Sequence, residues 1–146
     1  MSEPMDVEAE VLFGSCLCDT VTFEVRSPFL RFAYCHCSRC RKATGTGHAT
    51  NLYCAPERFA WLAGHDLLVR YDLPSARSFS AVFCSKCGSP LPHHTRSGRE
   101  VVVPAGSLDT QPQQKPQASI FCASAVPWSI RGESVPCFAE LPEWWT

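Results

Sequence analysis

Seven of the ten cysteines fall in three tight groups, at spacings that suit the binding of a metal ion. The groups are Cys16-Leu-Cys18, Cys35-His-Cys-Ser-Arg-Cys40 and Cys84-Ser-Lys-Cys87. Cysteines two apart on a strand point to the same face, so a small bend brings both sulfurs to one ion. The last group is followed by Gly88, which can adopt the positive φ that turns backbone N–H groups toward the sulfurs. This Cys-x-x-Cys-Gly turn is the strongest metal-binding signal in the chain.

Zinc is the metal that such thiol groups favour, in a tetrahedron with Zn–S distances of about 2.3 Å. A closed structural site needs four ligands, and the two pairs supply them: Cys16, Cys18, Cys84 and Cys87. The remaining group, Cys35, Cys37 and Cys40, then has three ligands and no evident fourth. Three protein ligands and an open position are typical of catalytic zinc. We therefore predict two zinc sites per chain, one structural and one reactive, and expect the second to be the more easily lost on purification.

Spacing alone leaves other partitions open. The pair Cys16 and Cys18 could instead join the 35–40 group, and Cys54 could complete the second site. A lone cysteine in an apolar run is more typical of a core, and Cys122 and Cys137 read in the same way. Disulfides are a further alternative, but the acidic start of the chain does not resemble a secretory signal. We therefore expect a cytoplasmic protein, whose thiols stay reduced.

Basic residues surround the group of three cysteines. Arg39, Arg41 and Lys42 could hold the carboxylates of an anionic substrate, which arginine binds well. They could equally offset the charge of three thiolates on zinc, or form a solvated basic turn. His36 stands between two candidate ligands and would face away from them on a strand. It is therefore expected to support the site rather than to bind the metal.

The segment that follows contains glycine and polar residues and is expected to line a substrate pocket. Its candidate substrate-binding residues are Thr44 and His48, with Thr46 beside them. His48 could carry a proton, although a lone histidine is more often not catalytic. His93 and His94 are weaker candidates for the same role.

Short elements must position these groups. The chain has 146 residues, of which 12 are prolines, and this length suits one domain. Val21, Phe23 and Val25 alternate with polar residues, which is typical of a half-buried strand. The other expected strands are 32–35, 59–62, 67–71, 79–83, 100–104 and 119–122, and residues 38–44 could form a short helix. The sequence therefore predicts a mainly β fold of short antiparallel strands, with a flexible acidic tail at 1–10, a zinc-binding domain at 11–140 and a C-terminal tail at 141–146.

Charge and hydropathy exclude some partners. The chain has 13 basic and 14 acidic residues and a net charge of −1, whereas nucleic-acid binders usually carry a basic excess. No apolar run reaches the length of about 18 residues that a membrane helix needs. We expect neither nucleic acid nor a membrane as a partner, and the sequence leaves the oligomeric state open.

The chain resembles the glutathione-dependent formaldehyde-activating enzyme family, which also includes centromere protein V. The resemblance runs from about Gly14 to Phe138. Four stretches carry it, in order along the chain: Gly14-Ser-Cys-Leu-Cys18, Cys35-His-Cys-Ser-Arg-Cys-Arg-Lys-Ala-Thr-Gly45, Phe83-Cys-Ser-Lys-Cys-Gly-Ser-Pro-Leu91 and Pro104-Ala-Gly-Ser-Leu-Asp109.

This resemblance implies a single-domain Mss4-like β fold with the same two zinc sites. It also implies a carbon–sulfur lyase that joins glutathione to formaldehyde and gives S-hydroxymethylglutathione. Two positions depart from the family pattern: Asp19 stands where glycine is usual, and Ser119 stands where the family often has histidine. Two alternative functions stay open at this point. One is a lyase that acts on another small thiol adduct, and the other is a non-catalytic, zinc-stabilised module that binds a protein or nucleic acid.

Overall fold

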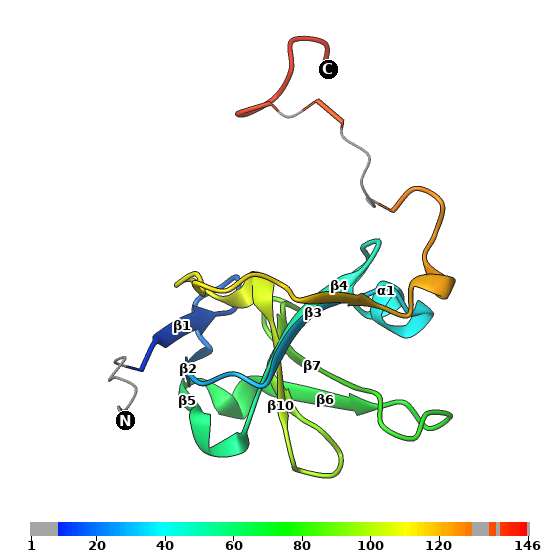
Figure 1. The fold of residues 1–146 in the computed structure, drawn as a ribbon. Helices are drawn as coiled ribbons and strands as arrows, with labels where there is room; N and C mark the ends of the chain where they lie inside the picture. The colour runs from blue at the N-terminus through cyan, green and yellow to red at the C-terminus, as the bar shows by residue number, and fades with distance from the viewer. Residues whose placement is uncertain (1–8, 130–134, 137, 146) are drawn as a thin grey trace, which may run out of the picture.

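The structure of the chain, a computed structural model, describes residues 9–129, 135–136 and 138–145. These residues form one domain with eleven short strands, one α-helix and four 3-10 helices. The strands make three sheets, arranged around a common core (Figure 1). The predicted mainly β fold of short antiparallel strands is therefore confirmed, with one parallel pair, β11 beside β3. Cys137 lies outside the described residues.

The first sheet has the order β1-β2-β5 and contains β1 (Val11–Ser15), β2 (Thr22–Arg26) and β5 (Phe59–Ala63). Phe23 and Val25 on β2 are fully buried, as the alternation of apolar and polar residues predicts. Gly14 on β1 lies under the Phe23 ring, and a Cβ built at Gly14 would lie 2.2 Å from Cζ of Phe23. Only glycine therefore fits at this position while the ring stays in place.

The second sheet has five strands in the order β11-β3-β4-β10-β9. Its members are β11 (Ala118–Ile120), β3 (Arg31–Cys35), β4 (Ala49–Cys54), β10 (Val101–Pro104) and β9 (His93–His94). The central strand β4 was not expected from the sequence, because Thr50 and Asn51 interrupt its apolar pattern. Leu52 and Cys54 on this strand are nevertheless fully buried in the core.

The third sheet has the order β6-β7-β8 and contains β6 (Leu68–Asp72), β7 (Ser80–Cys84) and β8 (Pro90–Leu91). The strand expected at 67–71 begins one residue later, because residues 65–67 form a 3-10 helix, η2 (His65–Leu67). The other 3-10 helices are η1 (Pro56–Arg58), η3 (Ala105–Ser107) and η4 (Cys122–Ser124).

The single α-helix among the described residues, α1 (Ser38–Thr44), follows β3 directly and coincides with the range expected from the sequence. Sγ of Cys37 accepts a hydrogen bond from the N–H of Cys40 and so caps the start of the helix. Gly45 ends the helix at φ 69°, and its N–H donates to the carbonyl of Arg41. The helix is therefore held at the end of a sheet strand, with Cys37 at its N-cap and Cys40 on its first turn.

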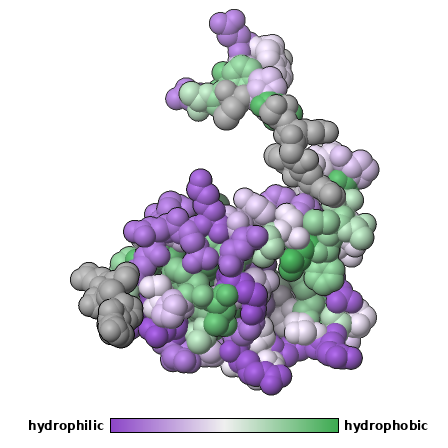
Figure 2. Space-filling model, in the orientation of Figure 1, coloured by the Kyte–Doolittle hydropathy of each residue, from purple (hydrophilic) through white to green (hydrophobic). Residues whose placement is uncertain are grey.

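Figure 2, in the same orientation as Figure 1, shows hydrophilic side chains along the edges of this face and apolar ones gathered between them. None of the helices in the described ranges has both the length and the apolar character needed to cross a bilayer.

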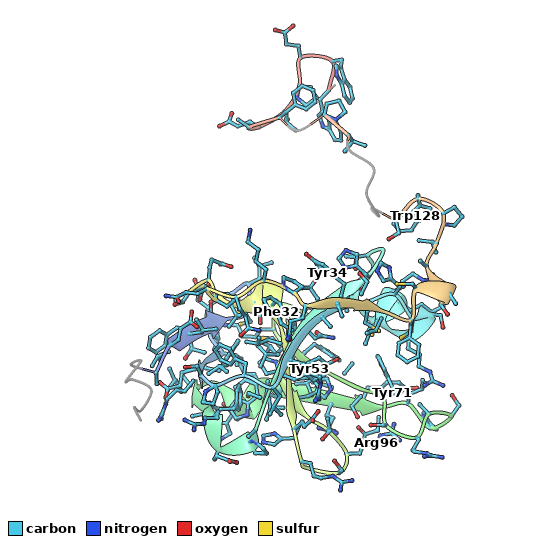
Figure 3. The ribbon with its side chains drawn as sticks, viewed as in Figure 1. Phe32, Tyr34, Tyr53, Tyr71, Arg96 and Trp128 are labelled. Atoms are coloured by element: carbon cyan, nitrogen blue, oxygen red, sulfur yellow. The ribbon has the colours of Figure 1, made fainter. Side chains whose placement is uncertain are left out.

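Arg96 fastens the loop between β6 and β7 (Figure 3). Its Nη2 donates to the carbonyls of Leu73 at 2.6 Å and Phe79 at 2.7 Å, and its Nη1 donates to the carbonyl of Ala76 at 2.7 Å. Hydrogen bonds from a charged donor are among the stronger ones in proteins. The loop therefore depends on one guanidinium group.

Replacing Arg96 by methionine keeps the apolar stem and removes these donors. Because the guanidinium is partly exposed, we expect a loss of unfolding free energy of about 1 to 2 kcal/mol, together with faster amide exchange of residues 73–79. Urea denaturation and hydrogen–deuterium exchange measure the two effects. The matched control is Arg99→Met, which removes an exposed arginine nearby; equal effects of both substitutions would contradict this role of Arg96.

Candidate metal centres and the adjoining cavities

Four cysteine sulfurs from two distant parts of the chain meet at one point. Their ligand atoms all lie within 4.8 Å of one another, and the residues are Cys16, Cys18, Cys84 and Cys87. Sγ of Cys18 lies 3.6 Å from Sγ of Cys16 and 4.0 Å from Sγ of Cys84. In a tetrahedron with Zn–S bonds of 2.3 Å, neighbouring sulfurs are about 3.8 Å apart. The donor set therefore fits a tetrahedral metal ion that prefers sulfur.

The backbone around these sulfurs is arranged to favour thiolates. The N–H of Val21 donates to Sγ of Cys16, and the N–H of Lys86 donates to Sγ of Cys84, both at 3.3 Å. Gly88 has φ 78°, in the left-handed region, and its N–H donates to the carbonyl of Cys84 at 2.7 Å. The turn expected after Cys84 is thus formed, and its N–H groups face the sulfur as such turns require.

Hydrogen bonds from Ser89 lower the pKa of the Cys87 thiol to about 5. Contacts with Thr20 lower the pKa of Cys18 as well, whereas desolvation raises that of Cys84. The surroundings of Cys87 and Cys18 therefore favour the ionised thiolate, the form in which a cysteine binds a metal.

Asp19 follows the first cysteine pair at φ 65°. Side chains other than glycine rarely adopt this conformation, and aspartate is among those that tolerate it best. The preference for glycine at this position, which the family resemblance implied, thus has a physical reason, and the aspartate is compatible with the same turn.

A second group of sulfurs lies where β3 meets α1. Cys35 ends the strand, Cys37 caps the helix and Cys40 lies on its first turn, and the three ligand atoms lie within 4.8 Å of one another. A hydrogen bond from Cys40 lowers the pKa of the Cys35 thiol to about 6, and the same contact raises the pKa of Cys40. This group could hold a metal ion as well.

Among the described residues, no fourth cysteine, histidine or carboxylate joins this second group. Cys54, an alternative ligand considered from the sequence, lies at the far end of β4. At the other end of this strand, Ala49 pairs with Cys35. The five residue steps of extended chain from Ala49 to Cys54 span about 17 Å, and this distance separates Cys54 from the three-sulfur group. Burial also raises the pKa of the Cys54 thiol to about 11, as expected for a neutral core side chain. An ion held by the three sulfurs would therefore keep a position open.

The rings of two histidines and a tyrosine contact one another at steep angles beside the three-sulfur group. The ring of His48 lies 5.2 Å from that of His36 and 4.8 Å from that of Tyr34. His36 is buried, with Nε2 3.4 Å from Oγ of Ser119 and Nδ1 3.5 Å from Oγ of Ser129. Ser119, at the position where the family often has histidine, therefore lies against a residue that separates two of the candidate ligands.

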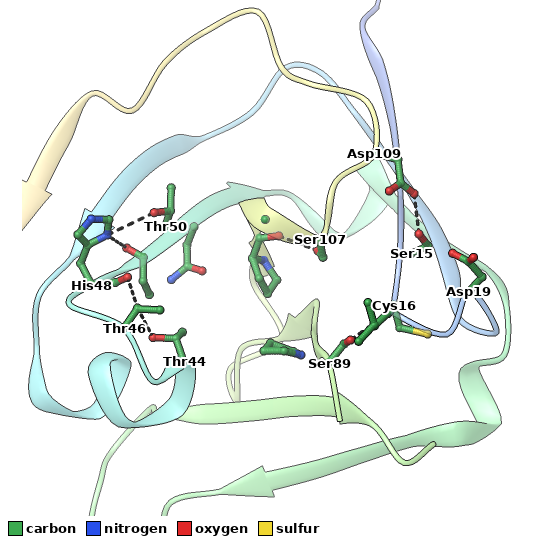
Figure 4. A pocket seen from close by; sticks show the side chains of 16 residues that line it. Ser15, Cys16, Asp19, Thr44, Thr46, His48, Thr50, Ser89, Ser107 and Asp109 are labelled. Atoms are coloured by element: carbon green, nitrogen blue, oxygen red, sulfur yellow. Dashed lines mark hydrogen bonds between the residues drawn. The ribbon is translucent and has the colours of Figure 1, made fainter. Parts of the chain in front are cut away.

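A cavity of about 540 Å³ opens beside Cys16 of the four-sulfur group (Figure 4). Thr44, Thr46, His48 and Thr50 line one end of it, and Ser15, Cys16, Asp19 and Asp109 line the other. Hydrogen bonds organise both ends: Thr46 Oγ1 donates to the carbonyl of His48 at 2.6 Å, and Ser15 Oγ donates to Oδ2 of Asp109 at 2.6 Å. Polar side chains thus stand at both ends of the cavity, with two carboxylates at one end and an imidazole at the other.

A smaller cavity of about 170 Å³ adjoins the first and contains Cys40 in its wall. Five residues line both cavities: Thr44, Ala49, Asn51, Pro90 and Pro104. The three-sulfur group therefore borders the smaller cavity directly, whereas Cys16 of the four-sulfur group borders the larger one.

Only some of the substrate-binding residues predicted from the sequence line a cavity. Thr44 and His48 line the large cavity. Arg39, Arg41 and Lys42 lie on α1 and line neither the large cavity nor the smaller one beside it. Asp19, Asp109 and Ser107 also line the large cavity, and the sequence analysis did not predict a role for them there. Asp109 is the last residue of one of the four family stretches, and that position was the only hint of such a role.

Arg41 has one unusual feature. Its Nε atom is buried, and the described residues offer it no hydrogen-bond partner. A buried donor without an acceptor costs free energy, so an acceptor brought by a ligand would stabilise this arrangement.

Comparison with known proteins identifies a family and related solved structures. Residues 11–124 match the model of the glutathione-dependent formaldehyde-activating enzyme family. The fold is similar to the crystal structure of a Rhodobacter sphaeroides protein, a Northeast Structural Genomics target, with a TM-score of 0.55 and 26% sequence identity over 71% of this chain and 97% of that one. A comparison with curated proteins finds no match.

Proposed function

Because the chain belongs to the glutathione-dependent formaldehyde-activating enzyme family, we propose that it is a zinc-dependent enzyme of the carbon–sulfur lyase type. It joins a small thiol to an aldehyde and cleaves the adduct in reverse. The proposed pair is glutathione and formaldehyde, and the product is S-hydroxymethylglutathione. The observation that supports this most is a three-sulfur group with no fourth protein ligand among the described residues, which borders the smaller of two adjoining cavities through Cys40.

In this proposal Cys35, Cys37 and Cys40 hold the reactive zinc, and the four-sulfur group holds the structural one. A zinc ion, when bound, supplies the Lewis acidity that lowers the pKa of a neighbouring thiol toward neutrality. The fold would be of the Mss4-like type, and a reducing, cytosolic location would keep the cysteines free, as all nine described ones are.

The residues of the large cavity would bind the polar part of the thiol. Thr44 and Thr50 offer hydroxyl groups, and Asp109 and Asp19 offer carboxylates that suit the ammonium group of an amino-acid thiol. Arg39, Arg41 and Lys42 lie on α1 outside both cavities, so in this proposal they add positive charge near the three-sulfur group rather than contact the substrate inside a cavity.

The reaction forms one bond and moves one proton. The sulfur of the thiol bonds to the aldehyde carbon, the π electron pair moves to oxygen, and the thiol proton ends on that oxygen. His48 is the proposed carrier of this proton. Its Nδ1 lies 3.3 Å from the carbonyl of Ala49 and 3.4 Å from Oγ1 of Thr50. In the proposed tautomer Nδ1–H donates to the carbonyl of Ala49 and Nε2 accepts the proton.

The proposal predicts that zinc-loaded protein accelerates the exchange of formaldehyde with glutathione above the spontaneous rate. Exchange-detected proton NMR on equilibrated mixtures, with and without protein, measures this directly. The absence of any acceleration would contradict the formaldehyde reaction. A repeat with cysteamine in place of glutathione separates a lyase for another thiol from one for glutathione, because only the former would accelerate the second mixture more strongly than the first.

The alternative of a non-catalytic binding module has its own readout. Tight DNA binding that weakens steeply with salt, together with no catalytic acceleration, would favour that alternative.

A further inference from the structure

The smaller cavity, beside Cys40, differs in chemistry from the large one. Its walls include the apolar side chains of Ala43, Phe79, Val82, Leu91 and Val102. No aspartate, glutamate, lysine or arginine lines it among the described residues. Its polar residues, Cys40, Thr44, Asn51, Ser80 and His93, are few beside the apolar ones. A charged group would find no ion-pair partner in this wall, so an uncharged, largely apolar group suits it better.

The histidine in its wall fits the same conclusion. Burial lowers the pKa of His93 to about 4, so its imidazole is neutral at physiological pH. The wall that carries Phe79 is also held in place, because Arg96 donates to the Phe79 carbonyl at 2.7 Å. The cavity wall thus carries no charge, and its segment at Phe79 is held in place by the hydrogen bond from Arg96.

The size of the cavity is informative. Its volume is about 170 Å³, close to that of a buried apolar cavity of about 150 Å³ known to hold benzene. The single carbon that formaldehyde contributes to an adduct would leave most of this space unfilled. The five residues shared by both cavities place the apolar space next to the polar one, so a single adduct could occupy both.

We propose that the substrate class of this site is a thiol adduct whose carbon group is apolar and about the size of a benzene ring. This inference rests on the function proposed above. The polar thiol part lies in the large cavity, the carbon group lies in the apolar cavity, and the reacting carbon–sulfur bond lies between them beside Cys40.

For the thiohemiacetal of an aromatic aldehyde, the cleavage reaction balances without a further reactant. The carbon–sulfur bond breaks and its electron pair goes to sulfur, which takes a proton. The hydroxyl oxygen loses its proton and forms the carbonyl, so the products are the free thiol and the aldehyde.

The test compares two stable conjugates that differ only in the carbon group, S-benzylglutathione and S-methylglutathione. Calorimetry on zinc-loaded protein should give a Kd at least about tenfold lower for the benzyl conjugate, the effect expected of an apolar group in a fitting pocket. Ala43→Phe, which fills the cavity from the exposed helix α1, should bring the ratio of the two Kd values close to one. The matched control, Ala63→Phe on β5, lies outside both cavities and should keep the ratio.

Benzyl alcohol alone provides a probe that does not depend on the thiol. It should shift the backbone amide NMR signals of Ala81 and Val82 in the wild type and not in Ala43→Phe. Equal affinities for the two conjugates, or no shift with benzyl alcohol, would overturn the proposed substrate class. The formaldehyde exchange assay does not depend on either of these measurements. Failure of the proposed substrate class and failure of the proposed enzymatic function can therefore be told apart.

Discussion

Replacing Cys87 by serine is expected to unfold the domain at physiological temperature. The four-sulfur group joins the end of β1 to the turn after β7, two segments that lie 66 residues apart at Cys18 and Cys84. Structural zinc sites in small domains contribute apparent free energies of about 10 to 16 kcal/mol, and whole domains are stable by only about 5 to 15 kcal/mol. Losing one of four ligands should therefore remove most of the net stability.

Circular dichroism during heating and zinc content of the purified variant measure this effect. The matched control is Cys122→Ser, which removes a partly buried thiol outside both sulfur groups and should melt close to the wild type. A Cys87→Ser variant that melts with the wild type would contradict a structural role for the four-sulfur group.

Replacing Cys40 by alanine should abolish the thiol–aldehyde reaction and leave the fold intact. Cys40 is one of only three sulfurs in the second group and borders the apolar cavity, so its loss leaves too few ligands to hold an ion. The rate of exchange between formaldehyde and glutathione should fall to the spontaneous rate. The melting temperature should stay much closer to that of the wild type than to that of Cys87→Ser, because the four-sulfur group is intact.

The same exchange assay on Cys122→Ser controls for the loss of a thiol as such and should retain the wild-type rate. Full activity of Cys40→Ala would place the chemistry outside the three-sulfur group. Loss of the fold in this variant would instead make both groups structural.

The three cysteine groups and the turn and helix that carry them were predictable, because cysteine spacing and strand periodicity are patterns between residues close together in the sequence. The helix at 38–44 and the positive φ of Gly88 were both expected and are both observed. The closeness of the four sulfurs is a long-range property, yet counting ligands predicted it as one of the open partitions, since a tetrahedral site needs four ligands. Chemistry with a fixed coordination number thus makes some tertiary contacts predictable.

The cavities were not predictable in the same way. They form where side chains from several strands fail to fill the space, and no local pattern records this. Ser15 and Asp109, which are 94 residues apart in the sequence, meet at one end of the large cavity. Thr50 and Asn51 of β4, the strand that the sequence pattern did not identify, line the same cavity. The basic residues Arg39, Arg41 and Lys42 were expected near a substrate from their position beside the cysteines, but adjacency in sequence does not fix which way a helix presents its side chains.

The central claim is that the two sulfur groups hold one zinc ion each and that only the second has an open position. The most direct measurement is zinc per folded chain, after reconstitution with zinc and removal of excess, in the wild type and in Cys40→Ala. The account predicts about two ions per chain in the wild type and about one in the variant. The same zinc content in both proteins would contradict it, because Cys40 would then not be a ligand.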